Sequence, residues 1–150
     1  MDLADLLEQS RQDLVAEAVE ALARAHLPHY SASRTEQNRE RLARLYDLTL
    51  ECVRSRTLLP INSYASTLAR ERHAAGFDLQ EVQTALNVLE EVIWREITAR
   101  MAPSDYPRAF GFTSTVLGAA KQTLAVEYVA LASHGAEASS LDLSALFKGT

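Results

Sequence analysis

Residues 64–82, YASTLARERHAAGFDLQEV, decide the fold of this chain because they hold the end of one helix and the start of the next. Gly76 can take the left-handed conformation with which many helices end, and Phe77 can supply the hydrophobic contact that accompanies such an end. Asp78 is a good N-cap residue, and Glu81 follows three positions later, as in a capping box. The stretch therefore predicts two neighbouring helices joined by a turn of two or three residues.

Apolar residues at spacings of three and four predict further helices on both sides of this turn. Asp2 is a suitable first N-cap, and Ser33 with Glu36 forms a second capping-box pattern. Five main helices are expected, over about 3–27, 33–56, 60–76, 78–101 and 107–133. Gly135 is expected to end the last of them, and a short amphipathic helix to follow over 141–147. The fold class is therefore an all-α, single-domain bundle of about five main helices plus a short C-terminal helix.

Composition narrows the class of protein. The chain has 150 residues, 47% of them hydrophobic, which suits one soluble domain. No apolar run reaches about 18 residues and the first residues are acidic, so neither a membrane span nor a cleaved leader is expected, and we expect a cytoplasmic protein. A modestly basic segment lies between two acidic ones within a net charge of −5. This pattern favours ion pairs between helices over nucleic-acid binding.

No motif for catalysis or for metal binding occurs. The chain has no Glu-x-x-His, no His-Glu-x-x-His, no glycine-rich phosphate loop and no Gly-x-Ser-x-Gly. His26 and His29 flank Pro28 and are interpreted as solvated loop residues rather than metal ligands, and Cys52 as a small core residue. The hypothesis is therefore a protein that is not an enzyme and has no catalytic residues, no metal ligands and no cofactor.

Two residues break the pattern of the helix over 78–101. Trp94 falls outside its apolar face, where it can anchor an interface or fold sideways over a neighbouring helix. Glu96 falls inside the apolar face, where a carboxylate can act as a ligand or switch group, pair with an arginine, or escape to solvent at the helix end. Both are candidate binding residues.

The last predicted helix is apolar around its whole circumference between Gln122 and Ala136, where Glu127 is the only formally charged residue. Such a helix is either central in a bundle or covered by another subunit. His73, near the end of an earlier helix, can be a surface histidine or the proximal ligand of a haem. A pocket for a haem or a small apolar ligand would be expected near Tyr64, His73 or Tyr128.

Residues 64–82, continued by Ala85, Leu86 and Leu89, resemble the N-terminal regulatory domain of the RsbT co-antagonist family, the RsbR-like proteins of bacterial stressosomes. In that family a helix ends in a basic segment and a glycine before a helix start of the Leu-x-Glu-Val type. The resemblance extends over roughly residues 6–133. It implies a helical domain that is globin-like without haem or a bundle, that dimerises, and that precedes an output domain. The family offers no catalytic residues to carry over.

The resemblance predicts a non-enzymatic sensor domain for signal transduction in the bacterial stress response. The expected output module is of the STAS, histidine kinase or transcription-factor type, and the homodimer would form through the last long helix or around Trp94. Residues 1–137 would be the sensory domain, and residues 138–150 a short helix or a linker toward such a module. The alternative is a helical sensor that binds haem or another small ligand.

Overall fold

Residues 1–148 form seven helical segments. The computed structural model describes the backbone of residues 1–148 and the side chains of residues 1–133. The elements are α1 (Leu3–Arg24), α2 (Pro28–Ala32), α3 (Thr35–Ser55), α4 (Leu59–Ala74), α5 (Leu79–Arg100), the short 3₁₀ helix η1 (Pro103–Asp105) and α6 (Tyr106–Lys148). No strand occurs within residues 1–148. The predicted all-α bundle is confirmed.

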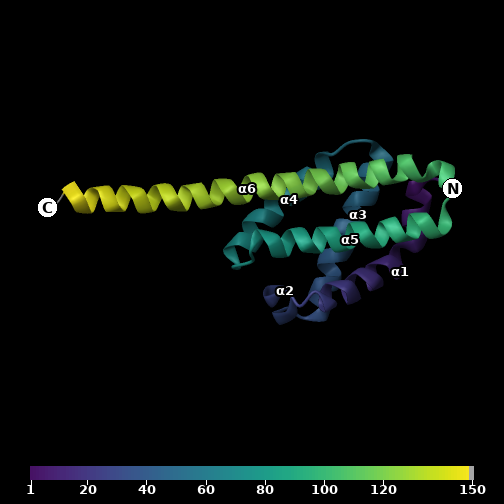
Figure 1. The fold of residues 1–150 in the computed structure, drawn as a ribbon, viewed down its shortest axis with the longest axis horizontal. Helices are drawn as coiled ribbons and strands as arrows, with labels where there is room; N and C mark the ends of the chain where they lie inside the picture. The colour runs from purple at the N-terminus through teal and green to yellow at the C-terminus, as the bar shows by residue number, and fades with distance from the viewer. Residues whose placement is uncertain (149–150) are drawn as a thin grey trace.

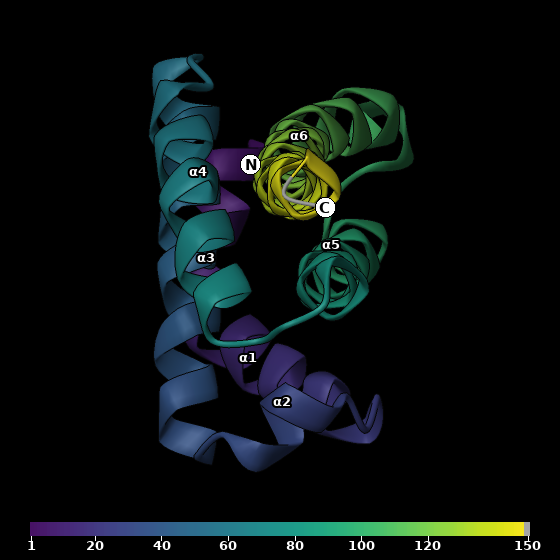
Figure 2. The same cartoon turned by 90° about the vertical axis from the view of Figure 1, so that its left-hand side faces the viewer.

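The long helices surround one apolar core. In the end-on view of Figure 2, α4 lies to the left of α6 and α5 below it, and α6 packs on both; α1 lies lower still and packs on α3 and α5. Every long helix contributes aliphatic side chains to the centre, and burial of each stabilises the fold by about 2 kcal/mol. The largest fully buried side chains are Leu6, Leu7, Leu14, Leu22, Leu42, Tyr46, Ile61, Leu86, Leu89, Ile93, Ile97 and Leu117.

The turn between α4 and α5 forms as its sequence predicts. Gly76 has a φ of +86°, in the left-handed region that favours glycine, and releases the chain from α4. Asp78 and Glu81 then form the complete capping box at the start of α5. Phe77, which follows Gly76 in this turn, has a buried side chain.

The second predicted capping box is wrong. Arg34, not Ser33, precedes the first residue of α3, and no side chain caps that helix end. The Ser33 hydroxyl donates instead to the His29 carbonyl, 2.8 Å away, because Ser33 ends the short helix α2. Proline at the first position of a helix is favourable, and Pro28 starts α2 in the segment that was expected to be a loop.

Helix α6 continues where the sequence predicted a break. It runs without interruption from Tyr106 to Lys148, so the segment 141–147 is its last part and not a separate short helix. One glycine within a helix costs only about 1 kcal/mol relative to alanine, which does not suffice to end it. Figure 1 shows α6 projecting far beyond the other helices. The side chains of residues 134–150 lie outside the described part, and the domain boundary at residue 137 stays a prediction. No helix within the described residues is long and apolar enough to cross a membrane.

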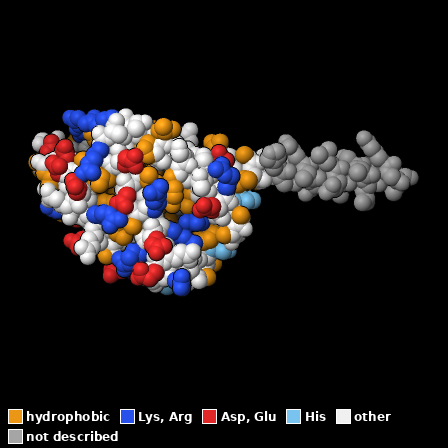
Figure 3. All heavy atoms as spheres, turned by 180° about the vertical axis from the view of Figure 1, so that it is seen from behind, with side chains coloured by type: hydrophobic (Ala, Val, Ile, Leu, Met, Phe, Trp, Pro, Cys, Tyr) orange, Lys and Arg blue, Asp and Glu red, His pale blue; other side chains and the backbone are white. Residues whose placement is uncertain are grey.

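Charged side chains on the surface connect neighbouring helices. Arg11 on α1 binds both carboxylate oxygens of Asp47 on α3, at 2.6 and 2.9 Å, and Lys121 on α6 pairs with Glu90 on α5. On the face drawn in Figure 3, basic and acidic side chains alternate rather than gather by sign. Arg54 of the basic segment pairs with Glu8 of the first acidic segment, which is the kind of pairing between helices that the charge distribution predicted.

Candidate functional site

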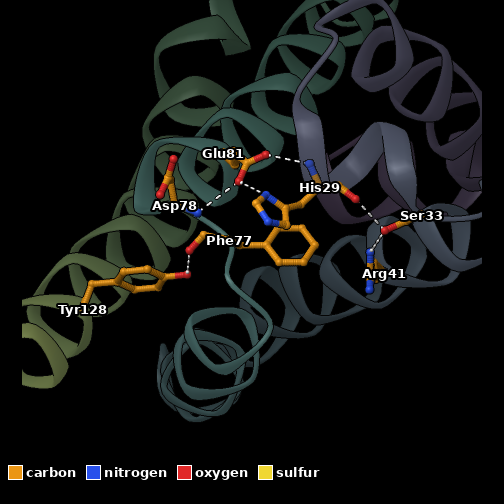
Figure 4. A network of polar contacts seen from close by, with 7 residues as sticks. All are labelled: His29, Ser33, Arg41, Phe77, Asp78, Glu81 and Tyr128. Atoms are coloured by element: carbon orange, nitrogen blue, oxygen red, sulfur yellow. Dashed lines mark hydrogen bonds and ion pairs between the residues drawn. The ribbon is translucent and has the colours of Figure 1, made fainter.

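The carboxylate of Glu81 is the centre of a polar network that joins three parts of the chain. Glu81 is 5% exposed and lies in the first turn of α5. One oxygen accepts the backbone N–H of His29 at 2.9 Å, and the other accepts the N–H of Asp78 at 3.0 Å. The second oxygen also lies 2.8 Å from His29 Nδ1 (Figure 4). One buried carboxylate therefore caps α5 and, across 52 residues, the start of α2.

The charge of Glu81 is stabilised by these donors. Burial by itself raises the pKa of this carboxyl, but the hydrogen bonds from the His29 and Asp78 amides and the contact with the His29 ring outweigh it. The net effect is a pKa below the usual range for glutamate. Glu81 is therefore ionised in the folded protein at neutral pH, and it forms an ion pair with His29 whenever that ring is protonated.

Phe77 is the aromatic centre of the same site. Its ring lies 4.9 Å from the His29 ring and 4.9 Å, edge to face, from the Tyr30 ring. The guanidinium carbons of Arg41 and Arg72 lie 5.5 and 5.4 Å from its centroid. Side chains from α2, α3 and α4 thus meet on the turn that connects α4 to α5.

Tyr128 ties the turn to α6. Burial raises the pKa of Tyr128 to about 12, so its hydroxyl stays protonated and can donate. It donates to the carbonyl oxygen of Phe77 at 3.0 Å (Figure 4). We define the turn network as His29, Phe77, Asp78, Glu81 and Tyr128. Through it, a displacement of the turn would act directly on α6, the helix that leaves the bundle.

Removal of the Tyr128 hydroxyl should destabilise the fold. We expect Tyr128→Phe to lower the free energy of unfolding by about 1 kcal/mol, because the buried carbonyl of Phe77 loses its donor. Urea unfolding followed by circular dichroism measures the loss. Tyr106→Phe is the matched control, since Tyr106 also donates to a backbone carbonyl, that of Thr98, but in an exposed position. An equal loss in both variants would contradict a special role for the Tyr128 bond.

Only one of the predicted binding residues belongs to the turn network. Tyr128 does, and the exposed ring of His73 packs edge to face against it, with the centroids 5.4 Å apart. Tyr64 is partly buried on α4, with the guanidinium of Arg44 5.7 Å from its ring centroid. The structure therefore brings Tyr128 and His73 together, whereas Tyr64 lies nine residues before His73, nearer the start of α4.

Trp94 and Glu96 lie elsewhere, toward the other end of α5. Trp94 is 41% exposed and folds sideways onto α6, where its ring lies 4.8 Å from that of Phe110. Glu96 pairs with Arg100, one turn later, at 3.7 Å. Trp94 therefore adopts the sideways packing over a neighbouring helix that the sequence left open, and Glu96 forms the pair with an arginine.

Two clefts open on the described surface. A cleft of about 700 Å³ lies at the end of the bundle where α1 and α6 begin, and Arg56, Arg108 and Phe112 are among its lining residues. A second, of about 240 Å³, is lined by Glu96 and Arg95 among others. Tyr64, His73 and Tyr128 line neither of these clefts. Among residues 1–133, no three metal-ligating side chains gather into a cluster.

Sequence reasoning missed the partners in the turn network. The interpretation of His29 as a solvated loop residue is wrong, because it belongs to α2 and contacts Glu81 and Phe77. Glu81 was recognised only as the capping acid of its own helix. Pro28 could have indicated a helix start at His29, but nothing local predicts a contact between residues 52 positions apart. Cys52 is buried, as predicted.

Comparison with known proteins identifies one family. A family model described as the RsbT co-antagonist protein rsbRD N-terminal domain matches residues 12–138, which is most of the chain and includes the whole turn network. The comparisons with curated proteins and with solved structures gave no match.

Proposed function

The chain belongs to the RsbT co-antagonist N-terminal domain family, and from this premise we propose that it senses a stimulus as a homodimer and passes it on through α6. The family is one of regulatory input domains in stressosome-type signalling. The projection of α6 is the observation that carries the proposal. A helix that is packed inside the domain and also extends beyond it can transmit a rearrangement to whatever follows.

The outer face of α6 supports pairing with a second copy. Val126 and Val129, three residues apart and therefore on one face, are 62% and 63% exposed. These are the most exposed large aliphatic side chains of α6 within the described residues. Two copies of α6 packed along this face would bury both valines. Trp94 supports a dimer less well, because its ring is occupied with Phe110.

The mechanism would be a shift between two packings of this dimer. A stimulus that binds one packing more tightly changes their populations in proportion to the difference in affinity. The turn network connects α2 and the α4–α5 turn to α6 through Tyr128, so it would couple the body of the domain to the dimer interface. The output module would be of the STAS, histidine kinase or transcription-factor type, and the domain would act in the cytoplasm without catalysing a reaction.

Light scattering after size-exclusion chromatography tests the dimer. We expect the chain at tens of micromolar to have twice its monomer mass, and the double variant Val126→Glu/Val129→Glu to have the monomer mass, because two carboxylates would then face each other across the interface. The control is Gln12→Glu, which adds a charge at an exposed polar position of α1, outside the proposed interface on α6, and should remain dimeric. A monomeric wild-type chain would overturn the proposal.

A haem-binding sensor has less support. A proximal histidine must face a pocket large enough for the macrocycle. His73 is exposed, packs on the edge of Tyr128 and lines neither described cleft. No observation therefore favours haem over a stimulus of another kind.

A further inference from the structure

Arg72 is a buried cation without an anion. It is 7% exposed, and its Nε atom is buried with no hydrogen-bond partner. No acidic side chain among residues 1–133 forms an ion pair with it. Arginine is rarely this buried unless it is paired, and an unsatisfied buried polar group in a native fold often marks an ion or water that completes it.

A second arginine, Arg41, approaches the same aromatic ring as Arg72. The Arg41 and Arg72 guanidinium carbons lie at nearly equal distances from the Phe77 centroid, 5.5 and 5.4 Å. Burial and, after it, the charge of Arg72 lower the pKa of Arg41. Nη1 of Arg41 donates to Ser33 and Asn38, whereas Nη2 has no partner among the described residues. The two like charges repel each other, and an anion that reaches both would offset this repulsion.

We propose that Arg41 and Arg72 form a binding site for an oxyanion of the phosphate class. The buried Nε of Arg72 has no hydrogen-bond partner, so this guanidinium keeps a donor for a ligand. Two planar guanidinium groups offer paired donors, which suit the several acceptor oxygens of a phosphate better than the two of a carboxylate. The basic segment noted in the sequence, residues 34–72, contains both arginines.

The position of this site gives the anion a regulatory role, which rests on the proposed function. The two arginines come from α3 and α4, and Phe77 is the residue whose carbonyl accepts from Tyr128 on α6. A bound phosphate would cancel the repulsion between the guanidinium groups and hold them together over the turn. The same anion would therefore stabilise the turn network and the packing of α6 that depends on it.

Titration of the ¹⁵N-labelled chain, followed by NMR at constant ionic strength, tests the site. The probes are inorganic phosphate, phenyl phosphate and acetate. We expect saturable shifts of the Phe77, Arg41 and Arg72 amides with both phosphates, and affinity for acetate about tenfold lower. Loss of one charge-assisted contact should weaken phosphate binding about tenfold in Arg41→Gln and in Arg72→Gln. If only inorganic phosphate binds, the ligand of the site is free phosphate. If phenyl phosphate binds equally well, the ligand can also be a phosphate ester.

Arg95→Gln is the matched control, because it removes one positive charge from an exposed position of α5. It should change the affinity less than twofold. Arg41→Gln keeps the test valid if Arg72→Gln does not fold, since Arg41 is only partly buried. Absence of saturable shifts, or equal weakening by Arg95→Gln, would overturn the site. Phosphate binding by the monomeric Val126→Glu/Val129→Glu variant separates failure of this site from failure of the dimer.

Discussion

Glu81→Ala should lower the free energy of unfolding by about 2 to 4 kcal/mol, measured by urea unfolding at pH 7. The reason is that three donors lose their acceptor at once: the amides of His29 and Asp78 and the His29 ring. The two amides belong to helix starts, where no backbone carbonyl can replace the carboxylate. Because α2 and α5 both lose a cap, we also expect faster amide hydrogen exchange at both helix starts.

Glu91→Ala is the control for this prediction. Glu91 lies on the same helix, but its carboxylate is exposed and pairs only with Arg95, at 3.6 Å. Exposed pairs of this kind contribute little to stability, so this variant should unfold almost as the wild type does. Equal losses in the two variants would mean that the contacts of Glu81 stabilise the fold no more than an exposed ion pair does.

The contribution of Glu81 depends on pH with a defined sign. Folding lowers its pKa, so the network stabilises the protein fully above the unfolded-state pKa of about 4.3 and loses this contribution as the pH falls through the lower folded-state value. The stability difference between the wild type and Glu81→Gln should therefore shrink as the pH falls below about 4.3. A difference that grows on acidification would contradict the lowered pKa.

The local part of the fold could be predicted because its causes are local. Gly76 and Glu81 are only five positions apart, and apolar spacing placed the four long helices before α6 within a few residues of their observed ends. The same reasoning failed at Ser33, where a competing acceptor, the His29 carbonyl, was available in a helix the pattern did not reveal. It failed again at Gly135, because the loss of helix stability caused by one glycine is too small to end the helix.

The candidate site was harder to predict because its contacts join distant parts of the sequence. Residues that break a helical pattern, such as Trp94 and Glu96, stand out in a sequence, yet each is satisfied by a neighbour. Arg72 does not stand out in the sequence, because basic residues are common near the end of a helix. Its burial without a carboxylate becomes visible only when α3 and the α4–α5 turn are packed around it.

We expect Phe77→Ala to have the largest effect of a single substitution in the site, a loss of about 3 to 5 kcal/mol in the free energy of unfolding. The ring is 7% exposed and contacts His29, Tyr30, Arg41 and Arg72, so its removal leaves a cavity and two guanidinium groups without their shared surface. Thermal unfolding measures the loss. Phosphate binding should also become undetectable.

Phe112→Ala is the control for Phe77→Ala, because it shows what the removal of a phenylalanine ring costs outside the turn network. Arg56 and Arg108 lie over the Phe112 ring at 4.5 and 5.3 Å, in the same manner, but that ring is only partly buried beside an open cleft. Water can fill the space it leaves, so the loss should be well under that of Phe77→Ala, and phosphate binding should persist. If Phe112→Ala abolished phosphate binding and Phe77→Ala did not, the anion would bind at the cleft. If the two variants lost equal stability, the turn network would not be the point at which α2, α4 and α6 are held together.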